Sequence, residues 1–374
     1  MRVLVTGGAG FIGSHLVDGL LERGHHVVVY DDLDGQVHGV DGRKPAYLSD
    51  QATFVRGDVR DYEALRACIL DHEVDVVSHQ AAVVGVGQSM YQIRRYVEAN
   101  SLGTANLLDI LANTEHGVRK VVVASSMSIY GEGKYLCEAD GVVFPKLRPP
   151  EQLSRREWEI RCPRCGRDVL PTGTDEDKPL FPTSIYATTK RDQEEMVLEF
   201  GEAYGIPSVA LRYFNVYGAR QAVSNPYTGV AAIFASRLLN DKAPLVFEDG
   251  RQSRDFTHVS DIVQANLLVT EGDAGDFDAF NVGTGRSTSV LDVAETLAEK
   301  LGRDVPPQLL DKFRSGDIRH CYADISKIRA TLGFAPKVGF DEGMEDLAAW
   351  LASESAEDRG DFAMQELEAR GLTR

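Results

Sequence analysis

The chain has 374 residues, enough for two domains that share one cleft, and its composition is ordinary for a globular protein. Its formal net charge of −17 argues against nucleic acid as a partner, and no apolar run is long enough to span a membrane. Five cysteines, an odd number, and a first strand that begins beside Met1 with no room for a signal peptide predict a cytoplasmic protein with reduced thiols.

The first residues carry a complete strand–turn–helix–strand unit. Residues 2–6 form an apolar strand, the glycine-rich turn Gly7–Gly13 follows, and residues 14–23 have the apolar spacing of a helix. A second apolar strand over residues 26–30 ends at Asp31. Glycines allow the backbone to approach a pyrophosphate at a helix N-terminus, and a carboxylate at Asp31 can bind both ribose hydroxyls while repelling a 2′-phosphate. This context predicts NAD binding and disfavours a merely structural glycine turn.

Strands and helices continue to alternate as far as residue 213. Further strands are expected at residues 53–55, 75–79, 120–124 and 208–213. The alternation predicts an α/β fold with a doubly wound parallel (Rossmann) sheet, whose ligands bind beyond the carboxyl ends of the strands. We expect residues 1–214 to form the NAD-binding domain. Residues 215–374 are expected to form a smaller α/β substrate domain that ends in a charged, helical tail from Glu354.

Two of these strands end in residues that suit contact with a ligand. Asp58 follows the third predicted strand, where it can reach an adenine amino group or cap the next helix, and its position leaves both readings open. Gln80, Ala81 and Ala82 follow the next strand, and small side chains there permit close approach of the backbone to a ligand.

Tyr186 and Lys190 form the predicted acid–base pair. Their spacing places both side chains on one face of a helix. A neighbouring lysine and a positively charged nicotinamide lower a phenol pKa, which would make Tyr186 a general base near neutrality. Ser126, at the end of an adjacent strand, can hydrogen-bond the same substrate hydroxyl. The three residues predict removal of a proton from a secondary alcohol whose hydride passes to NAD; the alternative is an ordinary surface pair.

Residues 141–178 break the regular pattern and are expected to form an insertion over the cleft. They are rich in proline and contain Cys162 and Cys165 in a Cys-Pro-x-Cys-Gly turn, which is half of a zinc site. The insertion has no other cysteine or histidine. We therefore expect no metal, and keep zinc completed by distant or partner-chain ligands, and a disulfide, as alternatives.

Taken together, the motifs resemble those of extended short-chain dehydrogenases/reductases, and within them the nucleotide-sugar epimerase/dehydratase group. The matching segments are residues 6–13, 57–61, 125–131, 212–218 and 254–261, with Tyr186 and Lys190. The resemblance extends from Met1 to about Trp350 and omits the insertion. It implies NAD as cofactor and a nucleoside-diphosphate sugar as substrate.

The resemblance also assigns residues to the two ligands. The cofactor set is Gly7, Gly10, Phe11, Ile12, Gly13, Asp31, Asp32, Asp58, Val59, Gln80, Ala81, Ala82, Asn100, Ser125, Tyr186, Lys190 and Tyr213. The substrate set is Ser126, Ser128, Asn215, Phe247, Arg254, Arg314 and Asp317. By resemblance, Asn215 binds the diphosphate-sugar, the two arginines bind the diphosphate, Asp317 binds the ribose and Phe247 lies against the base. Without the resemblance, the two arginines would be interpreted as surface charges and Phe247 as a core residue.

The resemblance further implies a homodimer formed by the helix around residues 100–112 and the helix of Lys190. These helices carry five apolar residues, more than packing against one face of the sheet requires, so we expect them to contribute to a dimer interface. The alternative is that they all pack inward. They are Leu102, Leu107, Leu108, Met196 and Val197.

Two departures from the group narrow the expected reaction. Met127 and Ser128 stand where 4,6-dehydratases carry an Asp-Glu pair, and decarboxylating members tend to have glutamate at position 128. Val84 replaces a lysine that is usual in UDP-galactose 4-epimerases, while the cysteine insertion resembles that of dTDP-L-rhamnose 4-epimerases. The sequence thus predicts NAD-dependent inversion at carbon 4 of a UDP- or dTDP-hexose through a transient 4-keto sugar. A dehydratase, a decarboxylase, a net dehydrogenase and a catalytically silent NAD-binding sensor or scaffold are the alternatives.

Overall fold

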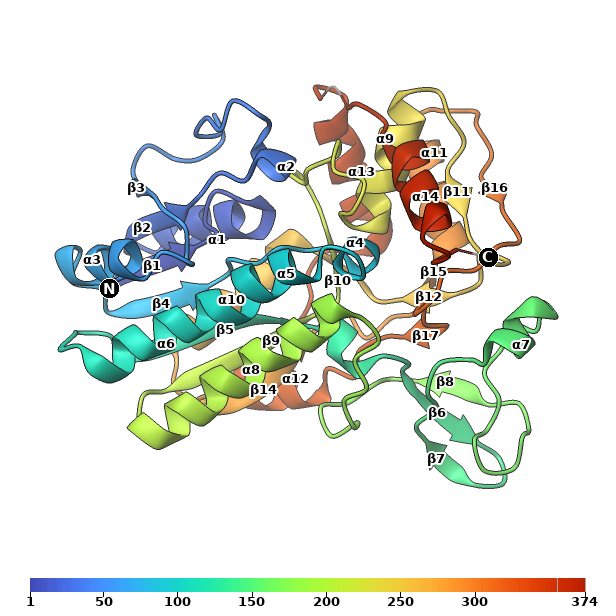
Figure 1. The fold of residues 1–374 in the computed structure, drawn as a ribbon, viewed down its shortest axis with the longest axis horizontal. Coiled ribbons are helices and arrows are strands. Elements are labelled where there is room, and N and C mark those ends of the chain that lie inside the picture. Colours follow the sequence, from blue (N-terminus) through green and yellow to red (C-terminus); the bar gives the residue numbers. More distant parts are fainter. Residues whose placement is uncertain (355, 374) are drawn as a thin grey trace.

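The centre of the molecule is a parallel sheet with the strand order β14-β9-β5-β4-β1-β2-β3 (Figure 1). The structure, a computed structural model, describes residues 1–354 and 356–373. The strands are β1 (Arg2–Thr6), β2 (His26–Asp31), β3 (Thr53–Arg56), β4 (Val76–His79), β5 (Lys120–Ser126), β9 (Ser208–Tyr213) and β14 (Asp278–Val282). The predicted α/β class with a doubly wound parallel sheet is confirmed.

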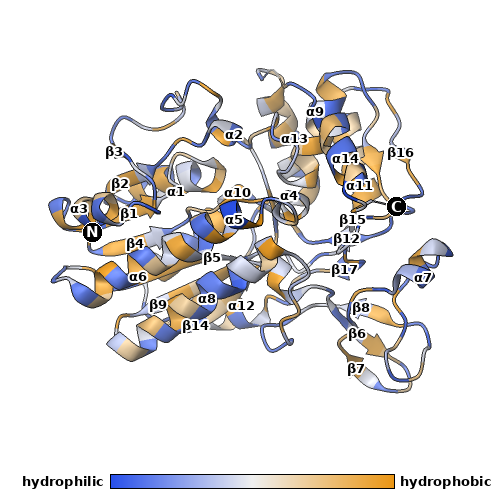
Figure 2. Ribbon diagram, in the orientation of Figure 1, coloured by the Kyte–Doolittle hydropathy of each residue, from blue (hydrophilic) through white to orange (hydrophobic). Residues whose placement is uncertain are grey.

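Helices cover both faces of this sheet, which is why its strands are continuous apolar runs. On one face lie α1 (Phe11–Glu22), α10 (Val259–Glu271) and α12 (Ser326–Leu332), and on the other α3 (Tyr62–Asp71), α6 (Gly103–Asn113) and α8 (Ile185–Tyr204). Figure 2 shows hydrophobic residues concentrated in the strands, while α8 mixes both kinds. No helix within residues 1–354 and 356–373 is long and apolar enough to cross a membrane.

Shorter elements connect these layers. They are α2 (Gly35–His38), α4 (Val86–Ser89), α5 (Ile93–Tyr96), the π-helix Val97–Leu102 and the 3₁₀-helix Met127–Tyr130. The helix expected around residues 100–112 is part of a continuous helical run through α5, the π-helix and α6. Residues 120–126 give a strand slightly longer than expected.

The chain returns to the central sheet after residue 214. The domain boundary that sequence analysis placed at that residue is therefore too simple. Strand β14 lies on β9, with Phe280 opposite Leu211, and α10 packs on α1 so closely that a Cβ at Gly19 would be 2.7 Å from Val263. The reason is that β9 is otherwise an edge strand, and the buried residues 279–282 cover that edge. The half built on the central sheet therefore includes residues that sequence analysis placed in the second domain.

The remaining C-terminal elements form the smaller part around a core of their own. They are β10 (Asn215–Tyr217), α9 (Val230–Leu239), β11 (Leu245–Val246), β12 (Ser253–Arg254), β13 (Phe256–His258), β15 (Thr288–Ser289), α11 (Val290–Lys300), β16 (Gln308–Leu309), β17 (His320–Cys321), α13 (Phe340–Leu351) and α14 (Gly360–Ala369). The helix expected in the charged tail is α14; residues 355 and 374 of that tail lie outside the described residues.

The insertion is a small antiparallel sheet that projects from the body of the molecule (Figure 1). Its elements are β6 (Lys134–Cys137), β7 (Gly141–Val143), α7 (Pro150–Ser154) and β8 (Leu170–Thr172), in the strand order β7-β6-β8. The sheet begins at Lys134, before the expected boundary at residue 141, because β6 supplies the central strand.

Most of the apolar residues expected at a dimer interface lie inside the chain. Leu107, Leu108 and Val197 are buried in the core beneath α6 and α8, and Met196 packs against that core. Leu102 alone of the five is exposed. Their apolar character is therefore explained largely by packing within one chain.

Candidate active site

One cavity of about 660 Å³ lies between the carboxyl ends of the sheet strands and the smaller C-terminal part. Every cofactor and substrate residue predicted from the sequence lines this cavity, except Asn100. Residues from positions 7 to 317 thus meet at one place, as expected for the switch point of a doubly wound sheet.

The glycine turn between β1 and α1 fits a pyrophosphate. A Cβ at Gly13 would lie 2.2 Å from the Gly7 carbonyl oxygen, so no side chain fits there without moving backbone. Gly7 has a φ of +67°, and a Cβ on it would lie 2.8 Å from the Ala81 backbone. Phe11, Ile12 and Gly13 begin α1 and line the cavity, which presents the unpaired N–H groups of a helix N-terminus to a ligand.

Asp31, at the end of β2, contacts the glycine turn through its side chain. One of its carboxylate oxygens accepts the Ala9 N–H at 2.9 Å, and the other accepts the Leu33 N–H at 2.9 Å. Each oxygen keeps acceptor capacity for a ribose hydroxyl. Burial, then the nearby charges of Asp31 and Asp58, raise the pKa of the neighbouring Asp32. This acidic corner suits the two ribose hydroxyls of NAD and opposes the 2′-phosphate of NADP.

The structure excludes one of the two interpretations of Asp58, that it caps the following helix. Asp61, not Asp58, caps α3, since its side chain accepts the Ala64 N–H at 3.1 Å. Asp58 lines the cavity and accepts hydrogen bonds from Arg60 Nε at 2.9 Å. Burial raises the Asp58 pKa, but the hydrogen bonds from the Arg60 side chain and backbone outweigh that and hold it below its usual range.

Tyr186, Lys190 and Ser126 come together where β5 ends and α8 begins. Ser184 caps α8 by accepting the Ala187 N–H at 3.1 Å, which places Tyr186 in the first turn. Lys190 lies one turn later, fully within the protein, and donates to the Ala124 carbonyl at 2.7 Å. The i, i+4 spacing thus directs both side chains into the cavity.

Without NAD, the protein does not lower the Tyr186 pKa; the predicted lowering depends on Lys190 together with the positive charge of a bound nicotinamide. Burial raises the pKa of Tyr186 to about 12, against a hydrogen bond with the Ser126 side chain that lowers it. Burial also lowers the pKa of Lys190 to about 7, so its positive charge is weakened near neutrality. The sequence reasoning left out this desolvation, which acts on both groups.

The strand end at residues 125–128 is built from serine side chains with different partners. Ser128 Oγ donates to Ser126 Oγ at 2.9 Å, and both hydroxyls belong to the cavity wall. Ser125 Oγ instead donates to the buried Glu194 at 2.6 Å, so its hydroxyl is committed to the interior. Met127 and Ser128 bring no carboxylate to this wall, as the sequence predicted.

Asn100 is the predicted cofactor residue that the structure keeps out of the cavity. Its amide is fully buried, accepts the Val83 N–H at 2.8 Å, and donates to the Val83 carbonyl and to Thr189 Oγ1. It therefore fastens the loop after β4 to α8. Its backbone lies within the π-helix, whose wider turn the sequence pattern did not reveal.

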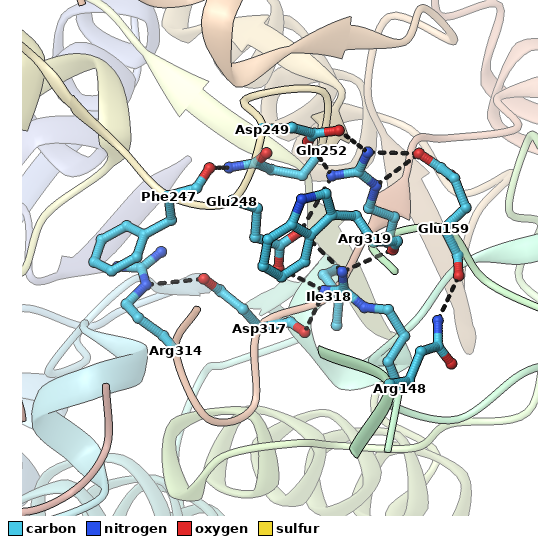
Figure 3. A network of polar contacts seen from close by, with 12 residues as sticks. Arg148, Glu159, Phe247, Glu248, Asp249, Gln252, Arg314, Asp317, Ile318 and Arg319 are labelled. Atoms are coloured by element: carbon cyan, nitrogen blue, oxygen red, sulfur yellow. Dashed lines mark hydrogen bonds and ion pairs between the residues drawn. The ribbon is translucent and has the colours of Figure 1, made fainter. Parts of the chain in front are cut away.

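The opposite end of the cavity carries Phe247, Arg314 and Asp317, shown in Figure 3. The Arg314 guanidinium lies 4.5 Å from the centre of the Phe247 ring, and its Nε donates to Asp317 Oδ2 at 2.8 Å. Arg254 donates to the backbone carbonyls of residues 253, 318 and 319, which aligns it beside them and leaves further N–H donors for a diphosphate. Asn215 Oδ1 is buried and has no hydrogen-bond partner among the described residues.

Sequence analysis missed the contribution of the C-terminal tail to the cavity. Met364, Leu367 and Leu372 line it, and the Leu372 carbonyl accepts the Ser315 N–H at 2.8 Å. Arg370 lies over the Tyr91 ring at 4.2 Å. The available signal was the i, i+4 spacing of Ala363 and Leu367, both buried, within a segment that looked uniformly charged.

Known proteins of similar sequence and structure agree with this geometry. Residues 3–148 match the NAD dependent epimerase/dehydratase family, and residues 168–347 match GDP-mannose 4,6 dehydratase. The chain is 36% identical to dTDP-L-rhamnose 4-epimerase of Burkholderia thailandensis, over 94% of this chain and 95% of that one. It is 33% identical to UDP-glucose 4-epimerase of Mycolicibacterium smegmatis, over 95% of this chain and 100% of that one.

Solved structures show the same likeness. The UDP-glucose 4-epimerase of Thermotoga maritima with UDP-glucose aligns with a TM-score of 0.77 at 32% identity, covering 94% of this chain and 99% of that one. The UDP-glucose 4-epimerase of Thermus thermophilus in complex with NAD aligns with a TM-score of 0.73, also at 32% identity and with the same coverage. The motifs predicted from sequence, the cavity that unites them and these relatives lead to one conclusion: the chain belongs to the NAD-dependent epimerase/dehydratase family.

Proposed function

We propose that this protein is an NAD-dependent epimerase that inverts carbon 4 of a nucleoside-diphosphate hexose through a transient 4-keto sugar. The observation that carries the proposal is the position of Tyr186, Lys190 and Ser126 between the two ends of one cavity. The glycine turn and Asp31 form one end, and Phe247 and the Arg314–Asp317 pair form the other. A cofactor and a nucleotide sugar can thus meet at the tyrosine.

The chain's own residues provide the binding and proton chemistry that this reaction needs. Gly7–Gly13 and Asp31 would hold the pyrophosphate and ribose of NAD, and Lys190 would hold the nicotinamide ribose. When bound, NAD supplies a hydride acceptor and donor, together with a positive charge that favours ionised Tyr186.

Tyr186 is proposed to take the proton from the 4-hydroxyl while Ser126 hydrogen-bonds the same oxygen. The phenol holds that proton while the sugar is a 4-ketone, and returns it once the ketone has been reduced on its other face. The cofactor ends each turnover as NAD. Loss of water is not expected, because Met127 and Ser128 cannot act as the acid that expels a 6-hydroxyl.

The nucleotide end supports UDP or dTDP as the carrier. Phe247 with Arg314 above it offers a stacking surface, and the named relatives act on UDP-glucose or dTDP-L-rhamnose. A panel of UDP- and dTDP-hexoses, followed by NMR of the sugar anomeric and carbon-4 protons, will identify the substrate. Formation of a 4-epimer without accumulation of NADH is the expected result. Net formation of NADH with an oxidised sugar would instead make the protein a dehydrogenase, and turnover of no sugar would make it an NAD-binding sensor.

Tyr186→Phe tests the proposed base. The substitution removes one oxygen and little volume, so NAD binding should persist while epimerisation falls by at least about a hundredfold, the loss typical of a positioned acid–base group. NAD content of the purified variant serves as the control. Near-native turnover by a variant that holds NAD would assign the base to another residue.

Assembly and location complete the proposal. We propose a homodimer through α6 and α8, supported by the exposed apolar side chains Val97 and Leu102 beside them. Sedimentation at micromolar concentration measures the mass, and a monomer there would contradict the dimer. We also propose a cytoplasmic location, supported by five free thiols; fractionation of cells measures it.

A further inference from the structure

A cluster of metal-binding side chains lies in the insertion, remote from the proposed chemistry. Cys137, Asp140, Cys162 and Cys165 each place one ligand atom within 4.8 Å of all the others. The Cys137 and Cys165 Sγ atoms are 3.5 Å apart, and Asp140 Oδ2 lies 3.1 Å from Cys162 Sγ and 3.5 Å from Cys137 Sγ. A tetrahedral zinc ion with Zn–S bonds of about 2.3 Å separates its sulfur ligands by about 3.8 Å. The four groups are therefore spaced for one tetrahedral ion.

Two turns of the same form supply these ligands. Cys137-x-x-Asp140-Gly141 joins β6 to β7, and Cys162-x-x-Cys165-Gly166 forms the second turn. Both glycines adopt left-handed backbone conformations, with φ of +70° and +75°. In the second turn the Arg164 N–H donates to Cys162 Sγ at 3.4 Å. Asp140 thus occupies the place that a fourth cysteine would have.

The two turns face each other across a very small core. The apolar cluster of the insertion consists of six residues, two of which are the cysteines themselves: Tyr135, Cys137, Val143, Ile160, Cys162 and Val169. Such a cluster buries too little apolar surface to order strands of three or four residues. Small modules of this kind depend on a metal or a disulfide. A disulfide would join only two of the four groups.

We propose that Cys137, Asp140, Cys162 and Cys165 bind one structural zinc ion that holds the insertion folded. Three thiols release their protons on binding, and with the carboxylate they complete a closed four-ligand shell with no position for a substrate. The ion is therefore structural and takes no part in the proposed epimerisation.

The position of the insertion gives the ion a mechanical role. Arg148 donates to both carboxylate oxygens of Glu248 at 2.8 Å, and Glu159 pairs with Arg319 and contacts His320 at 3.1 Å. Figure 3 shows this network beside Phe247 and Asp317. Because these contacts join the insertion to the nucleotide end of the cavity, loss of the ion should loosen that end.

The test measures metal in the full-length protein, purified without a chelator or a histidine tag from zinc-supplemented medium. Mass spectrometry of the metals should give about one zinc per chain. Cobalt(II) exchanged into the protein should show the intense visible bands of a tetrahedral ion and a thiolate-to-cobalt charge-transfer band. Removal of zinc should make the insertion sensitive to brief trypsin digestion, whereas the seven-stranded central sheet should stay resistant.

Variants separate this site from other cysteines. Cys165→Ser changes an exposed residue, so the central sheet should stay folded while zinc is lost and the insertion becomes sensitive to trypsin; Cys68→Ala, on the buried side of α3, is the control and should keep zinc. Asp140→Cys should keep zinc and release it more slowly to a chelator than wild type does. If Cys165→Ser fails to fold, the cobalt spectrum of the wild type decides. Metal-free protein after dialysis against zinc, zinc retained by Cys165→Ser, iron in place of zinc, or a Cys137–Cys165 disulfide would each overturn the proposal.

Discussion

Gly13→Ala should separate NAD binding from folding, because the turn has no space for a methyl group. The new Cβ would lie 2.2 Å from the Gly7 carbonyl oxygen, whereas ordinary contacts begin at 3.4 Å, so the turn must open by about 1.2 Å (3.4 minus 2.2). Such a shift removes at least one hydrogen bond to a charged phosphate, worth about 1.5–3 kcal/mol. NAD should therefore bind about 10- to 150-fold more weakly.

Titration calorimetry with NAD on apo-protein measures this effect, and circular dichroism confirms the fold of each variant. Gly339→Ala is the matched control, since a Cβ there meets nothing within 4 Å and the backbone has an ordinary φ of −70°. Its NAD affinity should equal that of wild type. Native affinity in folded Gly13→Ala would show that the pyrophosphate does not lie on this turn, and the reasoning above would fail.

Two further predictions concern buried charge. Glu248→Gln leaves the buried Arg148 guanidinium without a carboxylate partner, since Glu248 is 4% exposed and accepts from both Nη atoms of Arg148, whereas Arg319 keeps Glu159 and Asp249. The free energy of unfolding in urea, followed by tryptophan fluorescence, should fall by about 3–5 kcal/mol. The exposed Glu63→Gln should behave as wild type, and a similarly small change for Glu248→Gln would contradict the buried-pair assignment. Burial lowers the pKa of Lys190 to about 7, so between that pH and its unfolded pKa the unfolded chain binds the additional proton and stability rises with pH. The stability of wild type relative to Lys190→Met should therefore increase from about pH 7 to about pH 9, and equal pH profiles would refute the shifted pKa.

The fold was largely readable because each central strand is a run of residues such as Val3, Leu4 and Val5 that both faces of the sheet bury. Strand β14 was missed for a physical reason. Residues 278–282 follow a stretch of short elements, and only their pairing with β9 assigns them to the first sheet. Local patterns identify a strand but do not say which sheet it joins.

The residues of the site also differ in how well local sequence patterns predict their positions. Residues in local motifs, such as Gly13 and Tyr186, line the cavity as predicted, whereas Asn100 does not, since a π-helix and the loop at Val83 determine its orientation. The Tyr186 pKa could not be predicted, because desolvation depends on the packing of the whole wall. The partners of Cys162 and Cys165 were missed because one of them is an aspartate on a different turn.

The return of the chain to its first sheet has a consequence for synthesis on the ribosome. When β9 has emerged at residue 213, six of the seven strands exist, but its outer edge stays unpaired until β14 at residue 278 follows. At about 5–20 residues per second, that interval lasts roughly 3–13 s. During it the nascent chain exposes an unpaired strand edge, open to pairing with a neighbouring chain, that the finished protein covers with β14.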